Sequence, residues 1–149
     1  MRRIFYALIS LTILLFVGCN RTPKASIPDL KISTNGSDIL VSKGSYEWSN
    51  NVGLFTKETI NADSASPEQI AETIDGNEVN PQSELTLDFS EKPNNVKVIA
   101  WVDSKDTTYT YTDDKIIVPN EKGIYIYEVF AEWNQGYVSY TIKIIVTNE

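Results

Sequence analysis

The sequence contains no histidine, and its 149 residues include one cysteine and one methionine. Without an imidazole, the chain cannot form a serine–histidine or cysteine–histidine catalytic pair or a histidine-based zinc site. It also lacks a phosphate-cradling glycine loop, a G-x-S-x-G elbow and an S-x-x-K motif. With one cysteine, no disulfide can form within the chain, so a hydrophobic core has to hold the fold together. We therefore expect a protein that is not an enzyme and that carries no cofactor.

Basic side chains are outnumbered, with 13 lysines and arginines against 20 aspartates and glutamates. Two of the basic residues, Arg2 and Arg3, precede the cysteine, so the chain after it carries 11 basic and 20 acidic side chains, a net charge of −9. A surface of this charge repels nucleic acid and anionic lipid headgroups. We expect no nucleic-acid partner, and any membrane attachment has to come from apolar groups.

Residues 1–18 have the layout of a secretory signal peptide, with Arg2 and Arg3 followed by an apolar run and a small residue. The apolar run covers residues 4–17, which is shorter than the stretch of about 20 residues that spans a membrane. The only cysteine, Cys19, follows directly.

Residues 16–19, Phe-Val-Gly-Cys, resemble the lipobox of bacterial lipoproteins, although Phe16 stands where leucine is usual. The resemblance implies cleavage before Cys19 and acyl chains on this residue, which would anchor the protein to the outer face of the bacterial cell membrane. The alternative is an ordinary signal peptide cut near Gly18, which leaves a free thiol. Residues 19–28 contain two prolines and small polar residues, so we expect a tether there and one domain at 29–149.

The most regular stretch is 123–146, which predicts a long β-hairpin because apolar residues alternate along both arms. Both apolar stripes face one core only if Ala131 pairs with Val138 and Tyr127 with Ile142. That register requires a loop with an even number of residues. We expect a four-residue loop from Trp133 to Gly136, with the glycine at the position that most needs a positive φ.

The remaining chain predicts an all-β sandwich, because short alternating segments recur with a turn signal about every ten residues. One helix is expected at about 66–75, with Ser66 as its cap, Ile70 and Ile74 facing the core, and Gly76 ending it. Tyr125, at the start of a late strand, suggests a tyrosine corner, and the alternative is an ordinary core aromatic.

A family resemblance rests on 44–48 (Gly-Ser-Tyr-Glu-Trp), 63–67 (Asp-Ser-Ala-Ser-Pro), 87–89 (Leu-Asp-Phe) with Lys92 and Pro93, and the closing hairpin. Together these segments are similar to small uncharacterised lipoproteins secreted by Gram-positive bacteria of the Bacillus and Clostridium type. The resemblance implies an immunoglobulin-like or fibronectin-like antiparallel sandwich and an extracytoplasmic location. It implies no catalytic residues.

Aromatic residues are the main candidates for a binding surface. Trp101 is expected on the strand face opposite Val98, Trp133 at a hairpin tip, and Tyr109 on a neighbouring strand; exposed, they could stack on a sugar ring or anchor a protein contact. Alternatively, both faces of the central strand are covered, by the other sheet and by the helix. The aromatics suggest a non-catalytic interaction module for an unknown envelope partner, or else a carbohydrate- or cell-wall-binding accessory domain.

Four turn aspartates, Asp103, Asp106, Asp113 and Asp114, could converge as oxygen ligands for Ca²⁺. No regular calcium-loop spacing is present, and aspartate also has an ordinary backbone role in turns, so we expect no metal site. These carboxylates are also the only support for an enzyme that works without histidine.

Overall fold

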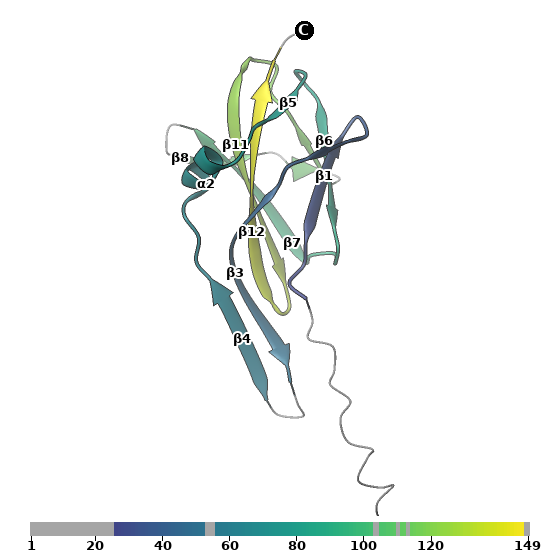
Figure 1. Cartoon of the computed structure of the whole chain (residues 1–149). Helices are drawn as coiled ribbons and strands as arrows, with labels where there is room; N and C mark the ends of the chain where they lie inside the picture. Colours follow the sequence, from purple (N-terminus) through teal and green to yellow (C-terminus); the bar gives the residue numbers. More distant parts are fainter. Residues whose placement is uncertain (1–25, 53–55, 103–104, 110, 113, 148–149) are drawn as a thin grey trace, which may run out of the picture.

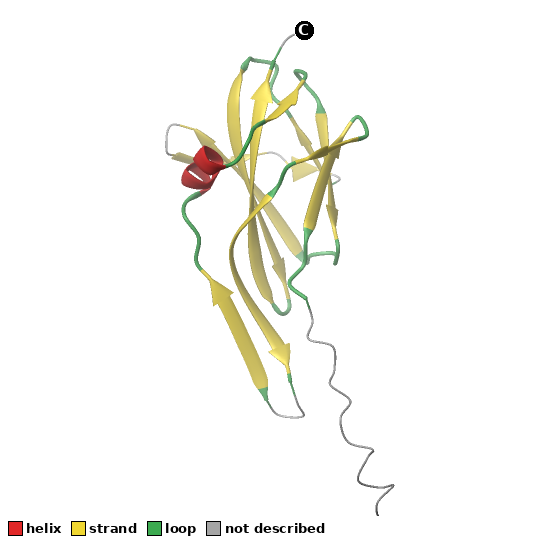
Figure 2. Ribbon diagram, viewed as in Figure 1, coloured by secondary structure: helices red, strands yellow, loops and turns green. Residues whose placement is uncertain are grey.

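A computed structural model describes residues 26–52, 56–102, 105–109, 111–112 and 114–147, with backbone alone for 102, 105–109 and 112. These residues form two packed β-sheets with one short helix on the outside of the second sheet (Figures 1 and 2). The elements are β1 (Leu30–Thr34), β2 (Ser37–Ile39), β3 (Ser42–Asn51), β4 (Lys57–Ala62), α2 (Pro67–Thr73), β5 (Asn77–Val79), β6 (Glu84–Phe89), β7 (Asn95–Val102), β8 (Lys105–Tyr109), β9 (Tyr111–Thr112), β10 (Lys115–Ile117), β11 (Gly123–Trp133) and β12 (Gly136–Val146).

The long hairpin β11–β12 is the centre of the second sheet, whose strand order is β4-β3-β12-β11-β7-β8. Ala131 pairs with Val138 and Tyr127 pairs with Ile142, which confirms the expected register. The loop differs from the expectation, because Trp133 and Gly136 are themselves paired and only residues 134 and 135 form the turn. Two residues are also an even number, so both apolar stripes still face the core.

The first sheet has the order β2-β1-β6-β10-β9 and covers the inner face of the second sheet. Its buried side chains include Ile32, Leu85 and Ile116, which alternate with exposed neighbours as a half-buried sheet requires. They meet the inner stripe of the long hairpin, where Tyr127, Val129 and their neighbours are fully buried. One continuous core therefore lies between the two sheets.

The strand order is that of an immunoglobulin-like sandwich. Strands β1-β6-β10-β9 occupy the places of A-B-E-D, and β12-β11-β7-β8 occupy those of G-F-C-C′. Tyr125, near the start of β11, donates a hydrogen bond from its hydroxyl to the Glu121 carbonyl at 2.9 Å. This bond to a backbone group four residues upstream is the expected tyrosine corner. The fold predicted from the sequence is thus confirmed.

The chain departs from the simple sandwich between β1 and β6, the strands in the A and B places. This insertion contains β3 and β4, which extend the second sheet beyond β12 and project past the sandwich at the end where the described chain begins (Figure 1). It also contains β5, which pairs in parallel with Ile144 to Val146 of β12. No strand was expected between the helix and β6, so β5 is an addition to the fold predicted from the sequence.

The helix α2 lies on the outer face of the second sheet, against β11, β12 and β3 (Figure 2). Ser66 accepts a hydrogen bond from the Gln69 backbone while the Gln69 side chain accepts one from the Ser66 backbone, which is the expected capping box. The core-facing residues differ from the expectation: Pro67 and Ala71 are buried, whereas Ile70 and Ile74 are only half-buried. A small alanine lets the short helix approach the sheet closely.

Candidate functional site

Trp133 belongs to the core, which corrects the expectation of an exposed aromatic at the hairpin tip. Its side chain is 7% exposed and meets the Trp48 ring edge-on, with 5.6 Å between ring centroids. Its indole nitrogen donates to the Glu91 carbonyl at 3.0 Å. The 90–94 connection thus covers the hairpin tip, and Trp133 is not available to a partner.

Trp101 lies on the outer face of the second sheet, opposite the buried Val98 and Ala100, as expected. It is half-buried, and its indole nitrogen donates to a Glu128 carboxylate oxygen at 3.2 Å. The other oxygen of Glu128 accepts from the Ser139 hydroxyl at 2.7 Å. Trp101 and Trp133 therefore lie on opposite faces of the same sheet and do not form one patch.

Several expected site residues have no described side chain. Tyr109 is placed by its backbone alone, paired with Val98. Asp106 is placed in the same way, opposite Trp101, whereas Asp103, Asp113 and Cys19 lie outside the described residues. Within the part of the chain that the structure describes, no three histidine, cysteine or acidic side chains are grouped to hold a metal ion. No described helix is long and apolar enough to cross a membrane.

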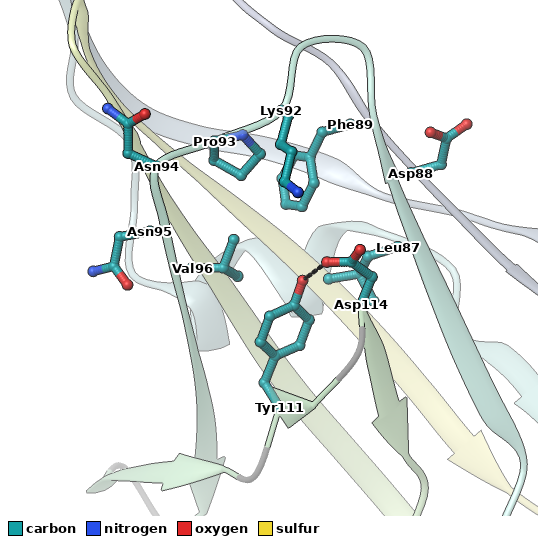
Figure 3. Close-up of a pocket in the computed structure, with 10 residues that line it drawn as sticks. All are labelled: Leu87, Asp88, Phe89, Lys92, Pro93, Asn94, Asn95, Val96, Tyr111 and Asp114. Carbon is teal, nitrogen blue, oxygen red and sulfur yellow. Dashed lines mark hydrogen bonds between the residues drawn. The ribbon is translucent and has the colours of Figure 1, made fainter.

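A cleft opens at the edge of the sandwich where β9 and the start of β10 face β7, and we call it the edge cleft (Figure 3). Its volume is about 450 Å³. Ten residues line it: Leu87, Asp88, Phe89, Lys92, Pro93, Asn94, Asn95, Val96, Tyr111 and Asp114. They come from the end of β6, the 90–94 connection, the start of β7 and the segment around β9.

The interior of the edge cleft is apolar. Phe89, Val96 and Tyr111 are half-buried and pack against the sandwich core, and Leu87 is buried. Pro93 lies beside them in the 90–94 connection (Figure 3). Strand alternation explains the arrangement, because Leu87 and Phe89 share the inward face of β6.

The polar side chains of the edge cleft divide into two groups. Asp88 is exposed between the two inward residues of β6, and its carboxylate points away from the cleft (Figure 3). Asn94 and Asn95 also turn away: their side-chain nitrogens donate at 2.9 Å to Asn134 and to Glu132, respectively. Both bonds fix the β7 wall of the cleft to the tip of the long hairpin. Lys92 and Asp114 remain at the rim.

Tyr111 and Asp114 form a hydrogen-bonded pair at the mouth of the cleft, with 2.5 Å between the hydroxyl and one carboxylate oxygen (Figure 3). Burial raises the pKa of the Tyr111 hydroxyl above its ordinary value, and the bond to Asp114 and the charge of Asp114 raise it further. The phenol therefore stays protonated at neutral pH and donates to Asp114. This leaves the second carboxylate oxygen of the exposed Asp114 without a partner among the described side chains.

The chain enters the sandwich beside this cleft, at a contact that we call the tether clamp. The Asp29 backbone exchanges two hydrogen bonds of 2.9 Å with Ser90, one to the serine hydroxyl and one from its backbone amide. Lys43 forms an ion pair of 2.6 Å with the Asp29 carboxylate. The Tyr140 hydroxyl, which is buried, donates to the Pro28 carbonyl at 2.9 Å. Since Ser90 directly follows Phe89, the clamp adjoins the floor of the edge cleft.

Sequence reasoning singled out Asp114 but missed the rest of the edge cleft. Phe89 and Pro93 entered only through the family resemblance, and Tyr111 belonged to none of the expected sites. No sequence signal indicates that the end of β6, the 90–94 connection and β9 line one cleft. Compared with protein-family models, with curated proteins and with solved structures, the chain shows no match.

Proposed function

We propose that this protein is a lipid-anchored binding module on the outer face of the bacterial cell membrane, that it acts without catalysis, and that the edge cleft is its binding site. The observation that carries the proposal is the tether clamp. Asp29 is fixed to Ser90, in the connection that forms one wall of the cleft. Any anchor upstream of Asp29 would therefore hold this end of the domain, with its cleft, toward the membrane.

The reach of such an anchor is limited. Asp29 lies ten positions after Cys19, and an extended chain spans at most about 3.5 Å per residue, or about 35 Å in total. Acyl chains on Cys19 would keep the edge cleft close to the membrane surface, and two or more chains would make the attachment stable. The partner would then be a component of the cell envelope near that surface.

The chemistry of the cleft supports binding without catalysis. Hydrolysis of glycosides by acid–base chemistry needs two carboxyl groups that flank the bond to be cleaved. Among the lining residues, Asp114 is the one acidic side chain at the mouth, since Asp88 points away (Figure 3). The partner of Asp114 is a phenol whose pKa is raised, so it does not act as a base at neutral pH.

The anchor is tested by fractionating cells that express the native chain or Cys19→Ala. The proposal expects the native protein in the membrane fraction with incorporated fatty acid, and the variant released without fatty acid. Equal release of both proteins would contradict the anchor.

The binding site is tested by photo-cross-linking in intact cells. A photoreactive residue at Lys92, on the cleft rim, is compared with one at Asn120, which is also exposed but lies at the opposite end of the sandwich. The expected result is a cross-linked species from position 92 that position 120 does not give and that Cys19→Ala reduces. The same products from both positions would reject the cleft as the binding site.

A further inference from the structure

The edge cleft combines an apolar interior with a charged rim. Its interior presents the rings of Phe89, Tyr111 and Pro93 around a half-buried Val96. Its rim presents one carboxylate, Asp114, and one ammonium, Lys92 (Figure 3). A volume of about 450 Å³ lies within the range of roughly 300–1,000 Å³ that is usual for small-ligand sites.

The two rim charges are free to act on a ligand. Lys92 is exposed and forms no ion pair with any residue that the structure describes. Asp114 has one oxygen held by Tyr111, so the bond to the phenol orients the carboxylate, and the second oxygen has no partner among the side chains that the structure describes. The cleft thus offers one oriented acceptor and one exposed donor, with opposite charges that nearly cancel.

A neutral ligand fits this balance better than an ion. A cation would be attracted by Asp114 and repelled by Lys92, and an anion the reverse, so the rim gives neither kind of ion a net electrostatic advantage. A hydroxyl group can donate to a carboxylate and accept from an ammonium, and hydrogen bonds to charged groups are the stronger ones. The same ligand needs an apolar face to lie against the rings.

We infer that the ligand of the edge cleft is a saccharide: one sugar ring lies with its C–H face against Tyr111 and Phe89 while its hydroxyl groups bond to Asp114 and Lys92. This inference rests on the proposed binding function and adds the chemical class of the ligand. It also gives the accessory domain for carbohydrate or cell wall a definite site, different from the tryptophans that the sequence suggested.

The test uses the full-length protein purified in detergent and saturation-transfer NMR. The probes are three neutral trisaccharides of different linkage and substitution (cellotriose, maltotriose and triacetylchitotriose), with glycerol as a polyol that has no ring face. The expected result is transfer to at least one trisaccharide, strongest at its C–H protons, and none to glycerol.

Three variants then locate the site. Asp114→Ala and Lys92→Ala, both at exposed positions, are each expected to weaken binding about tenfold or more, because each removes a charged hydrogen-bonding group. Asp38→Ala is the matched control: it lies in a second groove, of about 420 Å³, that contains no aromatic side chain. It should leave the affinity unchanged.

Failure of this inference can be told apart from failure of the proposed function. If no trisaccharide binds while position 92 still cross-links to an envelope protein, the saccharide is wrong and the binding module stands. If a trisaccharide binds but Asp38→Ala weakens it as much as Asp114→Ala does, the site is wrong. If binding survives all three variants, the inference is overturned.

Discussion

Gly136 lies directly against the backbone of Glu47, where β12 begins and β3 passes beside it. A Cβ atom added to Gly136 would overlap the Glu47 carbonyl oxygen and crowd the Trp48 backbone. The glycine is needed for this close approach of two strands, which pair at Gly136 and Trp48. Gly136 also has the expected positive φ, +156°, so the close approach of β3 is a second reason for glycine at this position.

Gly136→Ala should therefore lower the free energy of unfolding by about 2–3 kcal/mol, because β3 has to shift away from β12. Gly123→Ala is the control, since its added Cβ would meet only the Tyr125 ring at an ordinary 3.5 Å. Chemical denaturation of both variants measures the difference. Equal stability of the two would contradict the close approach.

The tyrosine corner predicts a second effect on stability. Tyr125→Phe removes the hydrogen bond to the Glu121 carbonyl and leaves the ring in place, so we expect a loss of about 1 kcal/mol. Tyr137→Phe serves as the comparison. The Tyr137 ring stacks on Phe130 at 5.1 Å, and no described residue pairs with its hydroxyl. Thermal unfolding should separate the two variants, and a Tyr137 loss as large as that of Tyr125 would argue against the corner.

The cap of α2 predicts a local effect. Ser66→Ala removes the acceptor for the Gln69 amide and should cost about 1 kcal/mol of helix stability. Amide hydrogen exchange should then become faster in 67–73, with little change in the long hairpin. Glu72→Ala, at an exposed helix position, is the control and should leave exchange nearly unchanged. Faster exchange throughout the sandwich would show that the helix supports the whole fold instead.

Tyr140 predicts a loss of stability at alkaline pH. Burial raises the pKa of its hydroxyl above the ordinary value, and the nearby charge of Asp29 raises it further. In the unfolded chain the hydroxyl has its ordinary pKa, so it loses its proton at a lower pH than in the folded protein. The protonated hydroxyl therefore contributes its full stabilisation to the fold below about pH 10. This contribution declines as the pH rises from there toward the folded pKa.

Urea denaturation between pH 8 and pH 11 tests this expectation. Tyr140→Phe should show a shallower decline in unfolding free energy with pH than the native protein. Tyr111, whose pKa is also raised, should account for part of the decline that remains. A Tyr140→Phe profile parallel to that of the native protein would exclude Tyr140 as a source of the pH dependence.

The sequence predicted those features that depend on neighbouring residues. The parity of the apolar stripes determined the pairing of Ala131 with Val138, and the turn chemistry of Ser66 to Gln69 determined the helix start. Periodicity cannot show what covers a given face. Trp133 looked exposed because it ends a strand, yet it is buried by Trp48 and by the Glu91 connection, which lies 42 residues away in the chain.

Contacts between distant segments also account for the features that sequence reasoning missed. β5 consists of three residues with no alternation of its own, and it becomes a strand only because Ile144 to Val146 offer a free edge. The helix buries Ala71 in place of Ile70, since the contact is decided by how closely α2 can approach β12. The edge cleft depends on Tyr111 of β9 and Phe89 of β6, which are far apart in the sequence and line the same hollow.

The edge of β12 that faces away from β11 pairs with two strands, β3 and β5, and this pairing bears on the solubility of the protein. β3 pairs along Gly136 to Thr141 and β5 pairs along Ile144 to Val146, so most of this long apolar strand is covered. Unpaired strand edges are the usual starting points for aggregation. On this side of the sheet the outermost strand is β4, whose exposed Lys57 and Glu58 are charged. A neighbouring molecule therefore meets a charged peripheral strand, and the apolar hairpin at the centre of the fold is shielded from intermolecular β-pairing.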